Sequence, residues 1–337
     1  MTKIIVDVYG GDYAPKEILD GCVAALQEES ELSLVLFGKE NEIKDYFNTL
    51  NDAKIQERIE IVDAPEVISN EEAPTEAVRR RPDSSLVKSM RRLKEDDSCE
   101  GFISAGSTGA VLVGATLIAG RIRGINRPAL APLLPTVTGK QVILIDCGAN
   151  IECKDINLLQ FAQMGKAYAL CNGVENPRIG LLSNGAEDHK GTTLNQEAFK
   201  LLKEDKSLNF LGNCEARDIL SGNYDVVVSD GFNGNIALKS AEGTANAVFS
   251  LLKEGIMKGG LRAKLGYLML KPVFKELKHK VDYNENGGAC FLGVNKVIVK
   301  AHGASKAKSI KAALLQCFKL IKSDVVGKIK EGISVEE

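Results

Sequence analysis

Short apolar runs alternate along the chain with longer segments of mixed apolar and polar character. The runs are rich in Val, Ile and Leu and are bounded by glycine or polar residues, which is typical of buried strands. Strands separated by helix-length segments at these intervals predict a wound α/β sheet with right-handed crossovers. The strands predicted in this way are residues 3–8, 32–37, 58–62, 101–103, 129–136, 141–145, 178–182, 225–228, 289–293 and 296–300.

Helices are predicted between these strands. Pro15 is suited to opening the first of them, and Asp83 or Ser84 to capping the third. Gly259 and Gly260 divide the segment 253–280 into two helices, whereas residues 63–82 contain three prolines and are predicted to be loop. The predicted helices are residues 16–29, 41–50, 83–97, 111–120, 157–170, 253–280 and 305–321.

The stretch 104–110 (Ser-Ala-Gly-Ser-Thr-Gly-Ala) lies between an apolar run and a long apolar segment, the order of a strand, a turn and a helix start. Gly106 and Gly109 allow positive φ and close approach of a ligand to the main chain. Ser104, Ser107 and Thr108 add hydroxyl groups, and a helix N-terminus offers unpaired N–H groups. This combination suits an anion such as phosphate. A capping turn without a ligand has the same residues, so both interpretations stay open here.

Three further loops rich in Gly, Asn, Asp and hydroxyl residues follow predicted strands, at residues 146–150, 183–191 and 229–235. Ligands of open α/β sheets bind beyond the carboxyl ends of strands. Four such loops are hard to explain as turns alone. Together they predict a single polar cleft.

Composition excludes several classes of protein. The chain has 337 residues, a net charge of −2, no Trp and 5% aromatic residues, which argues against a globally basic nucleic-acid binder that stacks bases. We expect no signal peptide and no membrane-spanning helix, because the longest apolar run is broken by glycines. The eight cysteines form no C-x-x-C pair, which predicts reduced, buried thiols in a reducing cytoplasm.

Nothing in the sequence requires a covalent nucleophile, a metal or a cofactor. There is no G-x-S-x-G motif, and the three histidines do not form a recognisable triad pattern, although His302 follows a strand in a glycine-flanked loop. The aspartates at strand ends lie in separate loops without a coordination signature, so no metal site is predicted. These aspartates are Asp12, Asp146, Asp188 and Asp230.

Two segments are locally basic. Residues 79–94 hold seven positive residues against one Asp, which fits either a solvated face or a docking surface for an acidic partner or phosphate group. Residues 253–280 hold eight positive and two negative residues interleaved with apolar ones. That segment fits a helical pair packed in a dimer, a basic amphipathic element on an anionic membrane surface, or both.

Ten stretches, spread in order over nearly the whole chain, resemble the bacterial phosphate acyltransferase family of membrane phospholipid synthesis, which makes acyl phosphate from acyl carrier protein thioesters. They are residues 6–15, 83–85, 104–110, 127–129, 146–150, 159–162, 190–191, 230–232, 287–289 and 301–303.

The resemblance implies a three-layer α/β/α fold like that of isocitrate and isopropylmalate dehydrogenases, as a single domain over residues 1–337. That domain has two intertwined lobes, a central cleft and a protruding amphipathic helical segment at 251–281. It also implies transfer of a long-chain acyl group from acyl carrier protein to inorganic phosphate, with no cofactor. Phosphate is itself the nucleophile, so the site has to hold the anion against the carbonyl and stabilise the oxyanion.

The residues of the matching loops are assigned roles by this resemblance. Lys190, His302 and Asn150 are the predicted catalytic residues, with Lys190 or His302 stabilising the oxyanion or the leaving thiolate. Arg79, Arg80, Arg91 and Arg92 are the predicted docking residues for the carrier. The predicted substrate-binding residues are Gly10, Gly11, Asp12, Ser104, Gly106, Ser107, Thr108, Gly109, Asp146, Lys154, Asp230 and Gly231.

The predicted partners are acyl carrier protein, inorganic phosphate and a second copy of the chain, without nucleic acid. We further expect a cytoplasmic protein in peripheral contact with the membrane and with the membrane glycerol-3-phosphate acyltransferase that takes the product. Other interpretations remain open. They are a phosphotransacetylase-like enzyme using acyl-coenzyme A, a hydroxy-acid dehydrogenase-like enzyme, and a non-catalytic phosphate- or acyl-binding regulator.

Overall fold

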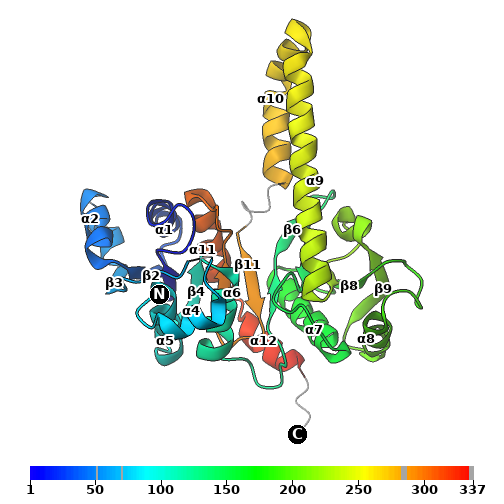
Figure 1. The fold of residues 1–337 in the computed structure, drawn as a ribbon, viewed down its shortest axis with the longest axis horizontal. Helices are drawn as coiled ribbons and strands as arrows, with labels where there is room; N and C mark the ends of the chain where they lie inside the picture. Colours follow the sequence, from blue (N-terminus) through cyan, green and yellow to red (C-terminus); the bar gives the residue numbers. More distant parts are fainter. Residues whose placement is uncertain (51, 70, 282–286, 334–337) are drawn as a thin grey trace.

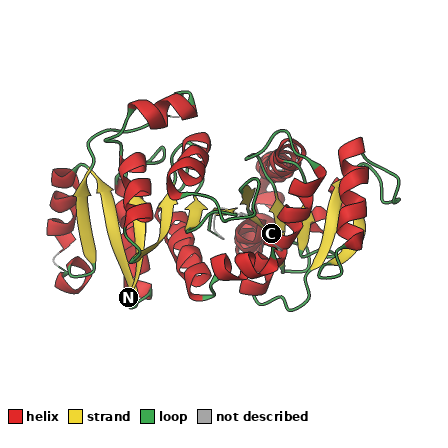
Figure 2. Cartoon of the chain, turned by 90° about the horizontal axis from the view of Figure 1, so that it is seen from below, coloured by secondary structure: helices red, strands yellow, loops and turns green. Residues whose placement is uncertain are grey.

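The computed structural model describes residues 1–337 except residues 51, 70, 282–286 and 334–337. Two bodies of strands and helices lie side by side, and a pair of long helices projects away from them (Figure 1). Each body is built around a sheet that has helices on both sides (Figure 2). The fold is therefore a three-layer α/β/α arrangement, as the family resemblance implies.

Within the described residues, the first sheet has seven strands in the order β3-β2-β1-β4-β12-β11-β5. Neighbouring strands from β3 to β12 run parallel, whereas β11 is antiparallel to both β12 and β5. The strands of this sheet are β1 (Thr2–Asp7), β2 (Leu32–Gly38), β3 (Ile59–Asp63), β4 (Cys99–Ser104), β5 (Ala129–Ala131), β11 (Ala289–Leu292) and β12 (Val297–Lys300).

The second sheet contains five strands of the described chain, in the order β6-β7-β10-β8-β9. All neighbours are parallel except the edge strand β6, which is antiparallel to β7. Its strands are β6 (Leu133–Pro135), β7 (Gln141–Ile145), β8 (Arg178–Ser183), β9 (Asn209–Glu215) and β10 (Val226–Val228).

Alternation along the strands sends side chains into different cores. Ile4 and Val6 of β1 belong to a core with α1, α7 and α11, whereas Ile5 packs on the opposite face with α5 and α6. In β7, Ile143 and Ile145 join the first core, and Val142 faces the other side of the second sheet. This period of two is what a sheet covered on both faces requires.

Helices cover both faces of the two sheets. Ser84 caps α5 by accepting a hydrogen bond from the backbone of Val87, as one of the predicted alternatives has it. The α-helices are α1 (Lys16–Glu28), α2 (Glu40–Leu50), α3 (Ala53–Gln56), α4 (Pro74–Arg80), α5 (Ser85–Glu95), α6 (Thr108–Gly114), α7 (Asp155–Cys171), α8 (Thr193–Glu204), α9 (Gly231–Lys258), α10 (Gly260–Val281), α11 (Ala307–Lys322) and α12 (Val325–Gly332). A π-helical turn (Ala115–Ala119) follows α6, and a 3-10 helix (Ala216–Ser221) follows β9.

The predicted strand 129–136 is wrong as a single element. The structure divides it at Pro132 into β5, which pairs with β11 in the first sheet, and β6, which pairs with β7 in the second. Proline has no N–H to donate to a ladder, so it suits the point where the chain leaves one sheet for the other. This crossing brings the two sheets together at the site described below.

Other boundaries also differ from prediction. Residues 74–80, predicted as loop, form α4, whose first residue is Pro74. The loop predicted at 229–235 is helical from Gly231, because α9 begins there rather than near residue 253. The helix α12 beyond residue 321 was not predicted.

The two projecting helices are α9 and α10, which divide at Gly259 and Gly260 (Figure 1). Apolar side chains remain exposed along α10, among them Leu261, Leu265 and Leu268, which are 89%, 64% and 64% exposed. Of the described residues, no helix combines the length and apolarity needed to cross a membrane.

Candidate active site

A pocket of about 410 Å³ lies where strand ends from both sheets meet. Its walls come from the loops after β4, β7 and β12, from the crossing between β5 and β6, and from the first turns of α9. Ligands bind at such carboxyl edges in α/β folds, which makes this pocket the candidate active site. It is lined by Gly106, Thr108, Leu130, Pro132, Leu133, Cys147, Gly148, Asn235, Leu238, Lys239, Glu242, Gly287, Gly288, Ala289, Lys300, Ala301, His302 and Gly303.

Lys300, the last residue of β12, brings a buried cation to this pocket. The residue is 7% exposed, and its Nζ donates a hydrogen bond to the carbonyl of Ala301. Burial lowers the pKa of Lys300 to about 8, although the carboxylates of Asp7 and Asp12 act in the opposite direction. The side chain is therefore mostly charged at neutral pH, in surroundings where a cation attracts an anion more strongly than it does in water.

A buried carboxylate organises the floor beside Lys300. Asp7 accepts hydrogen bonds from the hydroxyls of Ser85 at 2.6 Å and Ser104 at 2.7 Å. Burial raises the pKa of Asp7, while the two hydroxyl donors favour its charged form. Ser104 in turn accepts from the backbone N–H of Gly106 at 2.9 Å. The Ser104 hydroxyl is thus fully engaged within the protein, and it positions the loop that presents Gly106 to the pocket.

Glycines at the end of β1 fit against this floor. A Cβ on Gly10 would lie 2.7 Å from Asp7 Oδ2, from Gly106 N and from Ser104 Oγ, so no larger residue fits there without displacing them. Gly11 has a φ of +107°, and the backbone N–H of Asp12 donates to the carbonyl of Gly303 at 2.9 Å. Gly10, Gly11 and Asp12 therefore brace the pocket from behind and are not among the residues that line it.

His302 lines the pocket beside two lysines. Its Nδ1 accepts a hydrogen bond from the backbone N–H of Ala304 at 3.2 Å, so the neutral ring carries its proton on Nε2. Partial burial lowers the pKa of His302, and Lys239 and Lys300 lower it further. At neutral pH the ring is consequently an uncharged donor. Lys239 also forms an ion pair of 2.8 Å with Glu242.

Residues 104–110 form the predicted strand end, turn and helix start. Ser107 caps α6 by accepting from the backbone of Ala110 at 3.5 Å. Gly109 packs against α4, since a Cβ there would lie 2.5 Å from Pro74. Of the residues predicted in this loop, Gly106 and Thr108 line the pocket, whereas Ser104, Ser107 and Gly109 support the turn behind it.

Asp146 and Asn150 form a separate buried cluster after β7. The Asp146 carboxylate accepts from the backbone N–H groups of Leu130, Ala149 and Asn150 at 2.9, 3.1 and 2.7 Å. The Asn150 amide donates to Asp146 at 2.9 Å and to the Pro128 carbonyl at 2.7 Å. Both side chains are buried and lie outside the lining of the pocket. In the structure they hold the loop between the two sheets.

The remaining predicted residues of the second sheet also lie outside that lining. Asp230 caps α9 by accepting from the backbone of Asn233 at 2.8 Å, and Lys154 is the N-cap residue of α7. A Cβ on Gly231 would lie 2.5 Å from the Asn150 carbonyl oxygen. Lys190 is partly buried in the loop after β8, where its stem passes 2.9 Å from the Cβ position of Gly185.

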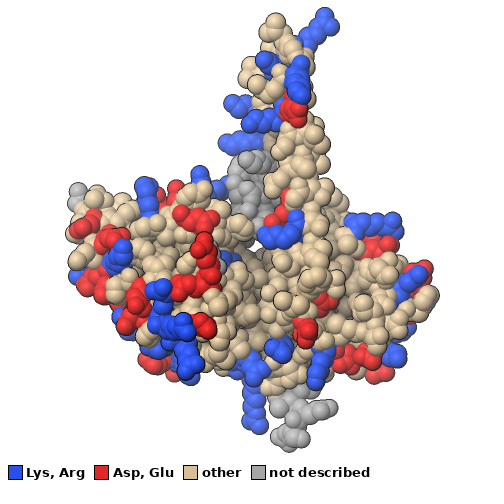
Figure 3. Space-filling view, in the orientation of Figure 1, with Lys and Arg blue, Asp and Glu red and all other residues tan. Residues whose placement is uncertain are grey.

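The basic face at residues 79–94 lies on α4 and α5, where Lys and Arg side chains gather in Figure 3. Arg80 pairs with Glu76 at 3.4 Å, and Arg92 pairs with Asp96 at 2.8 Å and with Glu60 at 3.2 Å. Arg79 and Arg91 are exposed. Local acidic residues therefore neutralise part of this face.

Sequence reasoning missed Lys300, Lys239, Asn235 and Glu242 as residues of the pocket. Lys300 carried a signal, because it ends an apolar strand two residues before His302. Asn235 belongs to the loop 229–235 that was predicted to border the cleft but was not singled out, whereas Lys239 and Glu242 carried no signal because they lie in a part of α9 that was not assigned. Across the described chain, no group of three or more His, Cys, Asp or Glu side chains is arranged to hold a metal ion.

Relatives with known names share this chain over its full length. A phosphate acyltransferase of Clostridium tetani is 50% identical over 333 residues, covering 98% of this chain and 97% of its own. A phosphate acyltransferase of Bacillus cereus is 45% identical over 335 residues and covers 99% of both chains. A sequence model of the family described as "Fatty acid synthesis protein" matches residues 2–328.

Solved structures share the fold. A phosphotransacetylase from Streptococcus pyogenes superimposes with a TM-score of 0.61 at 19% identity, covering 97% of this chain and 94% of its own. A putative 4-hydroxythreonine-4-phosphate dehydrogenase from Salmonella typhimurium has a TM-score of 0.54 at 14% identity, with 95% and 99% covered. The chain therefore belongs to the phosphate acyltransferase family and is an acyltransferase of fatty acid synthesis.

Proposed function

We propose that the protein transfers a long-chain acyl group from the thioester of acyl carrier protein to inorganic phosphate in the pocket between the two sheets. The observation that carries this proposal is the buried cation of Lys300 in that pocket, beside His302 and Lys239. An anionic nucleophile needs compensating charge when it leaves water. Two lysines and a neutral histidine supply that charge together with a directed proton donor.

The reaction needs no covalent enzyme intermediate. A phosphate oxygen attacks the thioester carbonyl carbon, a C–O bond forms and the C–S bond breaks. The electron pair of that bond leaves on the carrier sulfur. The sulfur takes up one proton and becomes a thiol, and the hydrogen phosphate gives up one proton on becoming an acyl phosphate, a mixed anhydride that keeps two negative charges. The proton passes from the phosphate to the sulfur, and His302 is suited to stabilising the reacting oxygen or sulfur by a hydrogen bond from Nε2–H, because Nδ1 accepts from Ala304.

In this proposal Lys300 and Lys239 hold the phosphate, and Gly106 and Thr108 border it. Lys190 and Asn150 keep the roles predicted from the family resemblance, as a second cation and as a polar group of the cleft. The positions of these two residues outside the pocket lining make their contribution smaller than that of Lys300. Asn150 acts through the loop that it holds.

The carrier protein is proposed to dock on α4 and α5, because this pathway's carrier is acidic and Arg79 and Arg91 are exposed there. Arg80 and Arg92 belong to the same face, although they are paired with neighbouring carboxylates. Long-range attraction to an acidic partner survives such pairing when positive charge remains in excess.

The projecting helices α9 and α10 are proposed to touch the membrane surface, where the product is used by the membrane glycerol-3-phosphate acyltransferase for phospholipid synthesis. Exposed leucines and interleaved basic residues on α10 support this, since such a surface binds anionic lipid. We further propose a cytoplasmic homodimer. Exposed apolar side chains near the base of the helix pair would form the dimer contact, and those near its tip would contact lipid.

The test mixes the protein with inorganic phosphate and palmitoyl carrier protein and follows acyl phosphate as its hydroxamate and the carrier thiol with a thiol reagent. We expect both products in equal amounts. We expect them to form more slowly when palmitoyl-coenzyme A is the donor. Turnover with palmitoyl-coenzyme A but not with palmitoyl carrier protein would favour the phosphotransacetylase-like alternative. Binding of palmitoyl carrier protein without any product would favour the regulator.

A further inference from the structure

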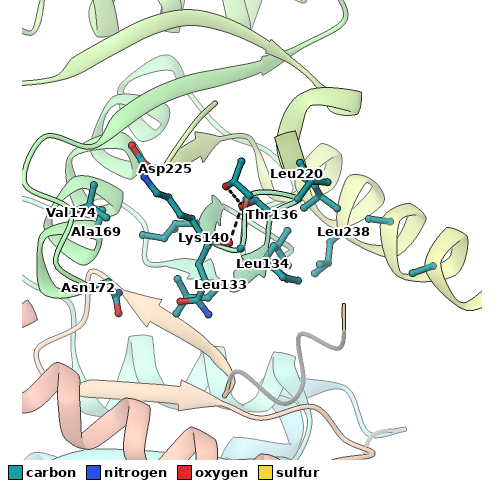
Figure 4. A pocket seen from close by; sticks show the side chains of 18 of the residues that line it. Leu133, Leu134, Thr136, Lys140, Ala169, Asn172, Val174, Leu220, Asp225 and Leu238 are labelled. Carbon is teal, nitrogen blue, oxygen red and sulfur yellow. Dashed lines mark hydrogen bonds between the residues drawn. The ribbon is translucent and has the colours of Figure 1, made fainter. Parts of the chain in front are cut away.

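A second, larger cavity lies next to the candidate active site. It has a volume of about 1420 Å³ and runs along the edge strand β6, the end of α7 and one face of α9. Figure 4 shows Leu220 and Leu238 on one side of it, Ala169 and Val174 on the other, and Leu133 between them. This exceeds the range of about 300–1,000 Å³ that is usual for a small-molecule site, so the cavity has room for an extended ligand.

The face of α9 that borders this cavity has a helical repeat. Leu238, Ala241, Glu242 and Ala245 line it, at relative positions 0, 3, 4 and 7. The two alanines have the smallest apolar side chains, and they leave open a channel beside the helix that larger residues would fill. The structure therefore combines an apolar wall with free space over two turns of α9.

The two cavities meet. Leu133, Leu238 and Glu242 line both the candidate active site and the larger cavity. At this junction the Glu242 carboxylate is paired with Lys239, whose Nζ lies 2.8 Å from Oε2. The two cavities are therefore neighbours that share these three side chains as a common wall.

Two polar groups in the wall of the larger cavity have partners within the protein, whereas Glu242 Oε1, at the junction of the two cavities, is buried without a hydrogen-bond partner. Asp225 receives hydrogen bonds from Arg178, including one from Nε at 2.9 Å. Thr136 donates to the carbonyl of Lys140 at 2.9 Å. Since Asp225 and Thr136 are hydrogen-bonded within the protein, an apolar chain that packs against them leaves no hydrogen bond of theirs unmade. The free-energy cost of that contact is therefore small.

We propose that this cavity binds the hydrocarbon chain of the acyl substrate, with the reacting carbonyl at the junction and the alkyl chain along the alanine face of α9. This inference rests on the proposed function and adds its acyl subsite. Apolar burial strengthens binding about threefold to fourfold per methylene. The enzyme should therefore use long acyl groups better than short ones for as long as the channel has room.

The first test narrows the channel with Ala245→Trp and compares butyryl and palmitoyl carrier protein as donors. We expect kcat/KM to fall at least tenfold for palmitoyl and less than twofold for butyryl. The matched control is Ala247→Trp, at an exposed position of the same helix that does not line the cavity, and it should change neither donor. Equal loss on both donors, or no loss on either, would overturn the proposal. Equal loss with a change in oligomeric mass would identify the occupant as a second copy of the chain.

A second test does not depend on turnover. The chain has no Trp, so Leu277→Trp, at the rim of the cavity on α10, introduces a single indole reporter. A bromine-labelled stearate below its micelle concentration should quench this indole, and should quench the exposed control Leu270→Trp at least tenfold less well. Quenching without acyl phosphate formation would leave the subsite standing and refute the proposed function. Acyl phosphate formation with equal quenching of both variants would refute the subsite.

Discussion

The carboxyl edges of the two sheets are built alike but present different chemistry. Each has a buried aspartate at or just beyond the end of a strand, Asp7 as the last residue of β1 and Asp146 directly after β7, and each aspartate holds the loops around it. Asp7 accepts from the hydroxyls of Ser85 and Ser104. Asp146 accepts from three backbone N–H groups and from the Asn150 amide.

The difference between the two edges indicates which of them supplies the positive charge that binds phosphate. Beside Asp7, the buried Lys300 lines the pocket and keeps a cation facing it. Beside Asp146, the donors named above come from strand β5 and from the loop after β7, and the carboxylate holds these two segments together. Both edges are rich in Gly, Asn and Asp in the sequence, but the first edge holds the phosphate in our account and the second joins the lobes.

The largest expected effect is on Lys300. Replacing it with Met (K300M) should lower kcat/KM for phosphate about 10²–10³-fold, as the loss of one preorganised electrostatic contact does. Lys300→Arg keeps the charge and should recover part of the loss. Initial rates of acyl phosphate formation over a phosphate series measure both variants. Near-normal turnover by K300M with an intact fold would break the comparison.

The second effect is on stability and belongs to the other edge. Asp146→Ala removes the acceptor of four hydrogen bonds, three of them buried, and should destabilise the protein by about 3 kcal/mol or more. Urea unfolding followed by circular dichroism measures this. Leu211→Ala, at an exposed position of β9, is the control and should change stability little. An unchanged unfolding midpoint for the Asp146 variant would show that this cluster does not hold the lobes together.

A third, smaller effect concerns the proposed docking face on α4 and α5. The double charge reversal of Arg79 and Arg91 to Glu should raise KM for the carrier about threefold to tenfold and leave KM for phosphate unchanged, because both side chains are exposed. Steady-state kinetics at two salt concentrations measure it. Lys200→Glu, on α8 of the other body, is the matched control. An unchanged carrier KM would leave this face simply solvated.

The smallest expected effect is on Lys190, and it sharpens the contrast with Lys300. Since Lys190 lies outside the residues that line the pocket, Lys190→Ala should lower kcat/KM less than tenfold. The same kinetic series as for K300M applies. A loss as large as that of K300M would indicate that Lys190 contacts the reacting phosphate. Both sheet edges would then contribute to phosphate binding.

Much of the fold follows from the sequence, because apolar runs bounded by glycine report buried strands directly. The strand 141–145 and the turn at 104–110 were predicted correctly for this reason. The division at Pro132 was not predicted, because an apolar run looks the same whether its two halves pair in one sheet or in two. Only tertiary pairing distinguishes those cases.

The predicted site residues lie at the carboxyl edges of the sheets, and their roles remain predictions. Polar loop residues such as Asp146, Asp230 and Asn150 attracted attention because they stand out in sequence, yet in the structure they cap and bind backbone. Lys300 was not predicted as a site residue, because it lies at the end of the predicted strand 296–300. Burial gives that lysine its significance, and burial depends on how β4, β11 and β12 pack, which no local pattern encodes.

The most direct test of the central claim, that Lys300 holds the phosphate as a cation, is KM for phosphate between pH 7.5 and 9.5. The charged form binds the anion, and the pKa of Lys300 is lowered to about 8, so its charge is lost as the pH rises through that value. The account predicts that KM rises about tenfold by pH 9 in the wild type and stays nearly flat in Lys300→Arg. The same profile in both proteins would contradict it.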